Sequence, residues 1–268
     1  KYYIGQTRGL KRLNVYDKKQ NLEKRFEEFA NSTDSNKENF GSVLSDIKSA
    51  HEKLSETTLS RVYLNESAWS GPSFVKLARR SERFVKALKS GDLEKISSAK
   101  QSFEDIISDN FKEYDKSIDK EIFVKMMEMY SVGVPKDQLP RSIDSLSKKY
   151  RGDFQKWGDD LYEKSLFVDA IKMQNLMSSF NKNFADLTIS EIEKDPAFKL
   201  QKSILDNYFS LMGQNREAEE SLKIAHRLFI DGLRKMSPKK SFYPDANFTM
   251  RLTYGQVGSY QPGDAMSY

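Results

Sequence analysis

The residues that could carry nucleophilic or acid–base chemistry are few in this chain. It has 268 residues, no cysteine and two histidines, His51 and His226. The absence of cysteine excludes thiol nucleophiles, thiolate metal sites and disulfide frameworks. His51 and Glu52 begin like the HExxH motif of zinc proteases, but the fifth position is Ser55, so the second histidine ligand is missing. We therefore interpret both histidines as ordinary helix residues and expect no metal site and no cofactor.

Carboxylates remain as candidates for catalysis by the chain alone. They are Asp159, Asp160, Glu217, Glu219 and Glu220. Adjacent acids on a charged helix usually form a solvated face rather than an acid–base pair. No GxSxG nucleophile motif, glycine-rich phosphate loop or calcium-binding loop occurs in the sequence. The residues therefore favour a solvated face, and an enzyme that is complete in itself and works through carboxylates stays as a rival interpretation.

Charge does not point to a nucleic acid or a membrane. The chain has 44 Lys plus Arg against 39 Asp plus Glu, a net charge of +5. Acidic residues lie close in sequence to most of the basic clusters. An ion-paired surface therefore explains these clusters better than a surface that binds the phosphates of a nucleic acid. No run approaches the ~18 apolar residues that span a bilayer. The basic clusters are Arg8/Lys11/Arg12, Arg79/Arg80/Arg83 and Lys239/Lys240.

The segment 61–71 differs from the sequence around it. It places Asn65, Glu66 and Trp69 just before the helix-breaking pair Gly71-Pro72. Polar and aromatic groups near a helix break can face a cleft. A capping asparagine and an ordinary buried tryptophan are the structural alternative. The residues alone leave both interpretations open.

Helices must position these residues, because most of the sequence has helical periodicity. Apolar residues recur at helical spacing from Leu10 to Met236, and polar or Gly/Pro segments separate one predicted helix from the next. Asp195 followed by Pro196 predicts a capped helix start. Gly213 is expected to end that helix before a last one over 215–236.

The periodicity changes after Ser237-Pro238. Alternating apolar residues predict a strand over 247–254, and no partner strand precedes it. We therefore predict a mainly α fold. It consists of a multi-helix insertion or cap domain over 1–240 and a strand-forming tail over 241–268, whose strand belongs to a sheet of a longer parent protein. Lysine at position 1 also suggests excision from something longer.

Both ends of the chain resemble a known family. The tail contains FYPDANFTMRLTYGQV over 242–257. This stretch is similar to the one after the helical insertion in bacterial dipeptidyl peptidases 7 and 11, which are chymotrypsin-like serine exopeptidases. The opening contains YIGQTRGLKRL over 3–13, which is similar to the family's entry into that insertion. The two resemblances bracket the whole chain.

The resemblance implies an α-helical cap over the substrate cleft of a double β-barrel that carries a Ser-His-Asp triad. Such enzymes release dipeptides from free peptide N-termini. The family's nucleophile motif, Gly-Asn-Ser-Gly-Ser-Pro, is absent, and neither histidine has the catalytic context. The chain alone should therefore hold no catalytic residue and be inactive. The implied partners are peptides with a free N-terminus and the β-barrel domain of the same parent, a homodimer in the periplasm of a Gram-negative bacterium.

The resemblance also implies an asparagine in the cap that helps to bind the α-ammonium group of the substrate. An ammonium has three donors, which acceptor oxygens must satisfy. Asn65, within Tyr63-Leu64-Asn65-Glu66, is the candidate. In this family the pocket that selects acidic or hydrophobic substrate side chains belongs to the barrel, so the sequence of this chain does not indicate which of them is preferred. A non-enzymatic helical interaction domain is the alternative function.

Overall fold

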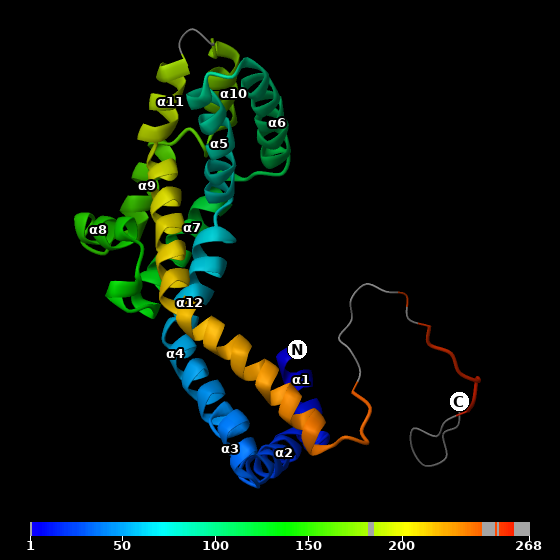
Figure 1. The fold of residues 1–268 in the computed structure, drawn as a ribbon. Helices are drawn as coiled ribbons and strands as arrows, with labels where there is room; N and C mark the ends of the chain where they lie inside the picture. Colours follow the sequence, from blue (N-terminus) through cyan, green and yellow to red (C-terminus); the bar gives the residue numbers. More distant parts are fainter. Residues whose placement is uncertain (1, 182–184, 243–249, 251, 260–268) are drawn as a thin grey trace.

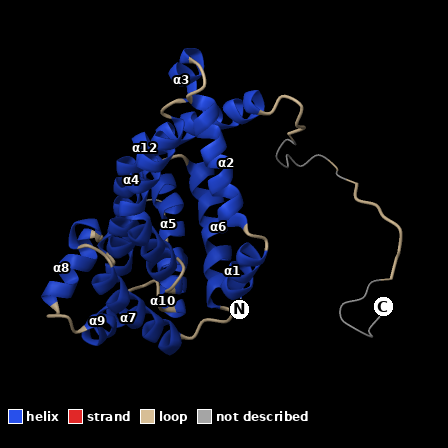
Figure 2. Ribbon diagram, turned by 90° about the horizontal axis from the view of Figure 1, so that it is seen from below, coloured by secondary structure: helices blue, strands red, loops and turns tan. Residues whose placement is uncertain are grey.

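Two long helices that run side by side in opposite directions organise the fold (Figure 1). The computed structural model describes residues 2–181, 185–242, 250 and 252–259. All regular structure in these residues is helical (Figure 2). The two long helices are α4 (Val43–Tyr63) and α12 (Pro196–Met236). The other helical elements are α1 (Tyr2–Arg12), α2 (Val15–Ala30), α3 (Asp34–Phe40), η1 (Leu64–Trp69), α5 (Ser73–Ser90), α6 (Leu93–Phe111), α7 (Lys116–Gly133), η2 (Lys136–Gln138), α8 (Arg141–Lys149), α9 (Phe154–Lys164), α10 (Ala170–Ser179) and α11 (Ala185–Lys194).

Within the part of the chain that the structure describes, apolar side chains form two separate cores along this pair of helices. The major core surrounds the fully buried Phe74, Phe123 and Met127 and draws on η1 and on α5 to α12. The minor core surrounds Phe26 and Phe40, where α2, α3, α4 and α12 meet. Helix α12 contributes to both, so it joins the two ends of the molecule. In the described residues, no helix combines the length and apolarity that crossing a membrane requires.

Helix α12 is continuous, and the prediction that Gly213 ends it is wrong. The helix spans 41 residues. A glycine inside a helix costs only ~1 kcal/mol relative to alanine, and packing against other elements usually outweighs such a local preference. Two residues beyond the glycine, the buried Asn215 Nδ2 donates a hydrogen bond to Thr57 Oγ1 at 2.7 Å. This contact ties the continued helix to α4.

The start of α12 confirms the capping signal. Asp195 Oδ1 accepts a hydrogen bond from the backbone N–H of Ala197 at 2.7 Å, and Pro196 occupies the first helical position. Asp195 Oδ2 accepts the N–H of Leu166 at 2.7 Å, which joins α12 to the turn after α9. Burial raises the pKa of the Asp195 carboxyl, while these hydrogen bonds oppose the shift.

The described tail residues contain no strand. Of the strand predicted over 247–254, residues 247–249 and 251 lie outside the described residues, and the others have no regular secondary structure. Residues 252–259 lie apart from the helices (Figure 1), and the side chains of Leu252 and Tyr254 are 83% and 93% exposed. The mainly α fold is confirmed, and the relation of the tail to a sheet stays a prediction.

Candidate functional site

The segment with Asn65 forms a π-helical turn at the end of α4. This turn, η1, spans Leu64–Trp69, and the N–H of Ser70 donates to the carbonyl oxygen of Asn65 at 2.9 Å. A π-helical turn changes the direction in which the following side chains point, and such turns are frequent at functional sites. The turn buries Leu64 and leaves Asn65 and Glu66 exposed.

A buried carboxylate fixes the chain where it leaves the turn. The break at Gly71-Pro72 is confirmed, because α5 starts directly after it. On α7, Asp119 Oδ1 accepts the backbone N–H of Ser73 at 2.6 Å, which satisfies a donor at the start of α5. Asp119 Oδ2 accepts the hydroxyls of Tyr162 at 2.7 Å and Tyr114 at 3.2 Å. Helices α7 and α9 therefore hold this end of the site.

Helix α7 also holds the residue that precedes the turn. The ring of Tyr63 stacks on that of Tyr130, with centroids 5.9 Å apart and an interplanar angle of 11°. A Cβ atom at Gly133 would overlap the Tyr63 ring. The backbone of α7 thus lies directly against Tyr63, and the turn is supported at both ends.

The Asn65 side chain is available to a ligand. Its residue is exposed, and its amide makes no hydrogen bond within the described part of the chain. Glu66 beside it is exposed and likewise makes no ion pair there. An amide oxygen and a carboxylate both accept hydrogen bonds from an ammonium group. The geometry is therefore compatible with the predicted site.

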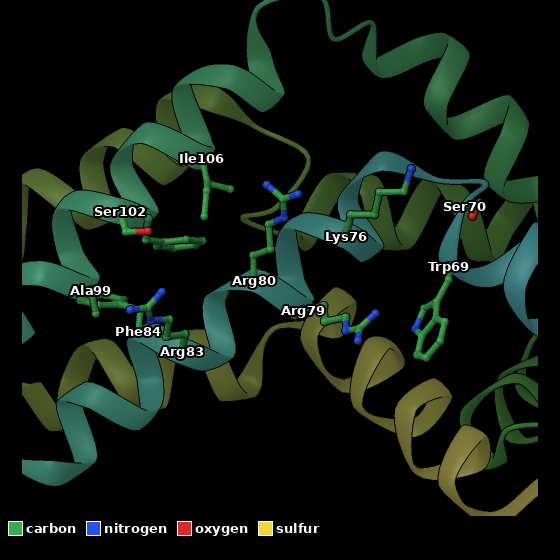
Figure 3. Close-up of a pocket in the computed structure, with 11 residues that line it drawn as sticks. Trp69, Ser70, Lys76, Arg79, Arg80, Arg83, Phe84, Ala99, Ser102 and Ile106 are labelled. Atoms are coloured by element: carbon green, nitrogen blue, oxygen red, sulfur yellow. The ribbon is translucent and has the colours of Figure 1, made fainter. Parts of the chain in front are cut away.

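A cavity of about 590 Å³ opens beside Trp69, between α5 and α6 (Figure 3). The side chains of Arg79, Arg80 and Arg83 line it. The prediction that ion pairs neutralise this cluster is wrong, since none of the three forms one with another described residue. The reason is geometric: Glu82, the nearest acid in sequence, lines a different cavity next to α12. Sequence reasoning named this cluster but missed the cavity.

The candidate catalytic carboxylates are ion-paired surface groups. Their partners lower the pKa of three of them, chiefly through hydrogen bonds from lysine. A carboxyl group with a lowered pKa is a poor general acid at neutral pH. The interpretation as a solvated face is confirmed. The pairs are Asp159 with Lys120 (2.8 Å), Asp160 with Lys164, Glu217 with Lys53 (3.5 Å), Glu219 with Arg61 (3.8 Å) and Glu220 with Lys223 (2.7 Å).

The two histidines meet across the long helices. His51 on α4 and His226 on α12 are exposed, and their ring centroids lie 6.2 Å apart. Sequence reasoning had no signal for this pairing, because only the antiparallel packing of α4 and α12 creates it. Among the described residues, no group of three or more histidine, aspartate or glutamate side chains could hold a metal ion.

Comparison with known sequences identifies the family. The sequence model of Peptidase S46 matches residues 1–268. The chain belongs to the peptidase S46 family. Among related proteins, Dipeptidyl-peptidase 7 of Porphyromonas gingivalis is 30% identical over 267 residues, which are 99% of this chain and 36% of that protein. The Asp/Glu-specific dipeptidyl-peptidase of Flavobacterium psychrophilum is 27% identical over 270 residues, 100% of this chain and 36% of that protein. The S46 chain thus spans about a third of the length of these curated relatives.

Solved structures share the fold of this S46 chain. The crystal structure of Porphyromonas endodontalis DPP11 in complex with the dipeptide Arg-Glu matches with a TM-score of 0.69 and 19% identity, over 97% of this chain and 36% of that one. Another crystal structure of the same protein matches with a TM-score of 0.65 and 18% identity. This match covers 95% of this chain and 36% of that one. At such identity the match shows the fold alone. The family resemblance read from the two ends of the sequence is confirmed.

Proposed function

We propose that this S46 chain is the α-helical cap of a serine dipeptidyl peptidase that removes dipeptides from free peptide N-termini. The observation that carries the proposal is the match of the whole chain to the S46 model, together with relatives named dipeptidyl-peptidases. The chain covers 36% of those relatives, so a longer parent has room for the catalytic triad. That parent acts in the periplasm as a homodimer, as the family resemblance implies.

In this parent, residues 1–240 cover the substrate cleft and residues 241–268 return to the β-barrel domain. The exposed side chains of the tail support this division. Met250, Leu252 and Tyr254 are 98%, 83% and 93% exposed. They alternate along the chain, as in a strand that buries one face, and covering them with another domain removes apolar surface from water. Acyl transfer itself takes place on the barrels.

Asn65 helps to bind the substrate's N-terminus. A dipeptidyl peptidase cleaves the peptide bond that follows the second residue, so it must hold the charged N-terminal amine at a fixed place. Hydrogen-bond acceptors at a closed end of the cleft can do this. Asn65 is exposed and has no partner in the described residues. The turn that carries it is held at both ends by α7, and a preorganised acceptor loses little freedom on binding. Glu66 adds negative charge beside it.

Replacing Asn65 in the full-length parent tests this role. Asn65→Ala should raise KM for dipeptidyl substrates about tenfold or more, because a hydrogen bond to a charged group contributes ~1.5–3 kcal/mol, while kcat changes less. Asn65→Asp should retain binding, since a carboxylate also accepts from an ammonium. Asn21→Ala, at an exposed position of α2, is the matched control. An unchanged KM for Asn65→Ala would remove Asn65 from the site.

Comparison of the isolated chain with its parent tests the proposed activity. The chain of residues 1–268 should not hydrolyse dipeptidyl substrates. The parent should hydrolyse them and lose activity with serine-directed reagents. Hydrolysis by the isolated chain would favour a self-contained carboxylate enzyme instead. A parent without peptidase activity would favour the helical interaction domain.

A further inference from the structure

The cavity beside Trp69 has the charge of an anion-binding site. Lys76, Arg79, Arg80 and Arg83 follow the spacing i, i+3, i+4, i+7 along α5. This spacing places all four on one face of the helix, and that face lines the cavity (Figure 3). No aspartate or glutamate occurs among the described residues that line it. An anionic ligand would relieve the repulsion between these like charges.

The cavity also has apolar walls and an unsatisfied donor. The rings of Phe84 and Phe103 stack there, with centroids 5.8 Å apart, and Ile106 lies beside them. Trp69 forms one end, and its buried indole N–H has no partner in the described residues. The guanidinium carbon of Arg79 lies 4.5 Å from the centre of the Trp69 ring. A donor and a cation at one place favour a charged acceptor.

Carboxylates fit this combination best. The planar guanidinium group of arginine matches a carboxylate with two parallel hydrogen bonds. The apolar walls suit the methylene groups that aspartate and glutamate carry. Peptides are also the ligands that the proposed activity brings to the cap.

We propose that the cavity binds acidic side chains of a peptide substrate beyond its first two residues. This inference rests on the proposed function, because it places peptides under the cap. Trp69 lies on the same helical turn as Asn65, so a peptide anchored at Asn65 starts beside the cavity. The basic face from Lys76 to Arg83 extends about 10 Å along α5. An extended peptide covers a similar distance, about 10 Å, from its first to its fourth residue.

The fluorescence of Trp69 provides a direct binding assay. The chain has two tryptophans, Trp69 and Trp157, so Trp157→Phe leaves Trp69 as the sole reporter. This chain is titrated with N-acetylated tetraglutamate and, as a neutral control, N-acetylated tetraglutamine. An acetylated peptide has no ammonium group, so its binding does not require Asn65. Failure of this proposal is therefore distinguishable from failure of the proposed function.

Only the acidic peptide should bind, and its affinity should fall as salt is added. The triple variant Arg79→Gln/Arg80→Gln/Arg83→Gln, called the cavity variant below, should bind the acidic peptide about tenfold or more weakly. The three arginines are exposed, and glutamine is a good helix former. The single variant Arg80→Gln should show a smaller loss and provides a second test with minimal change to the helix.

The matched control removes the same charge from other exposed helix positions. It is Arg25→Gln/Arg227→Gln/Arg234→Gln, on α2 and α12, and it should bind like the unmodified chain. In the parent, the cavity variant should raise KM for substrates with glutamate at the third and fourth residues, but not for those with glutamine there.

Three results would overturn the proposal. They are equal binding of the neutral peptide, equal affinities of the cavity variant and its matched control, and binding by the isolated chain but not by the parent. The last result would mean that another part of the parent covers the cavity.

Discussion

Gln201 on α12 is a fully buried polar residue whose side-chain amide lacks hydrogen bonds in the described part of the chain. It is 0% exposed, and neither its amide nitrogen nor its oxygen has a hydrogen-bond partner in the described residues. Asp119 and Asp195 are also buried, but their carboxylates accept hydrogen bonds from backbone N–H and hydroxyl groups. A buried polar group without a partner costs ~1–3 kcal/mol. Gln201 is therefore a local weak point of the major core.

Replacing Gln201 with methionine should stabilise the chain by about 1 kcal/mol, because an apolar side chain of similar size removes the desolvation penalty. Urea unfolding followed by circular dichroism should show a higher midpoint with an unchanged slope. Gln20→Met, at an exposed position of α2, should change the midpoint little. A lower midpoint for Gln201→Met would show that the amide contributes bonds of its own.

Two helical glycines differ in the space around them. A Cβ atom at Gly213, inside α12, would meet nothing within 4 Å. At Gly133, the last residue of α7, it would overlap the ring of Tyr63. Tyr63 immediately precedes the π-helical turn with Asn65. Gly213 therefore only weakens its helix, whereas Gly133 makes room for a neighbour that positions the candidate site.

Alanine at these two positions should act in opposite directions. Gly213→Ala should raise the free energy of unfolding by ~0.5–1 kcal/mol, because alanine has the higher helix propensity. Gly133→Ala should lower it, since the ring of Tyr63 must move away from Tyr130. Chemical denaturation of both variants measures the difference, and near-UV circular dichroism reports the displaced tyrosine. Equal effects at the two positions would contradict the close approach of α7 to Tyr63.

Buried phenols make the stability of the whole molecule sensitive to alkaline pH. Burial raises the pKa of Tyr114, Tyr130 and Tyr162 above the usual value, and the charge of Asp119 adds to the shift at Tyr114 and Tyr162. In the folded chain these groups keep protons that the unfolded chain releases near pH ~10. The folded state then binds more protons, so its stability falls as pH rises above about 10.

Alkaline titration of the chain should link the ionisation of its buried tyrosines to unfolding. Absorbance at 295 nm follows the ionisation of tyrosine side chains. The three buried ones should ionise only when far-UV circular dichroism shows loss of helix. Tyr130→Phe should move the alkaline unfolding midpoint to higher pH, because it removes one of the linked protons. Ionisation of all tyrosines while the helices persist would contradict this burial.

The amino-acid sequence alone predicts the helical class, the break at Gly71-Pro72, the cap at Asp195 and the family, because periodicity, capping chemistry and characteristic end segments are local. It also named Asn65 as the candidate site. Tertiary structure decided the continuity of α12, the pairing of the two histidines, and the cavity between α5 and α6. The physical reason is that each of these depends on contacts between residues far apart in the chain. Such contacts, like that between Asp119 and Ser73, leave no local pattern in the sequence.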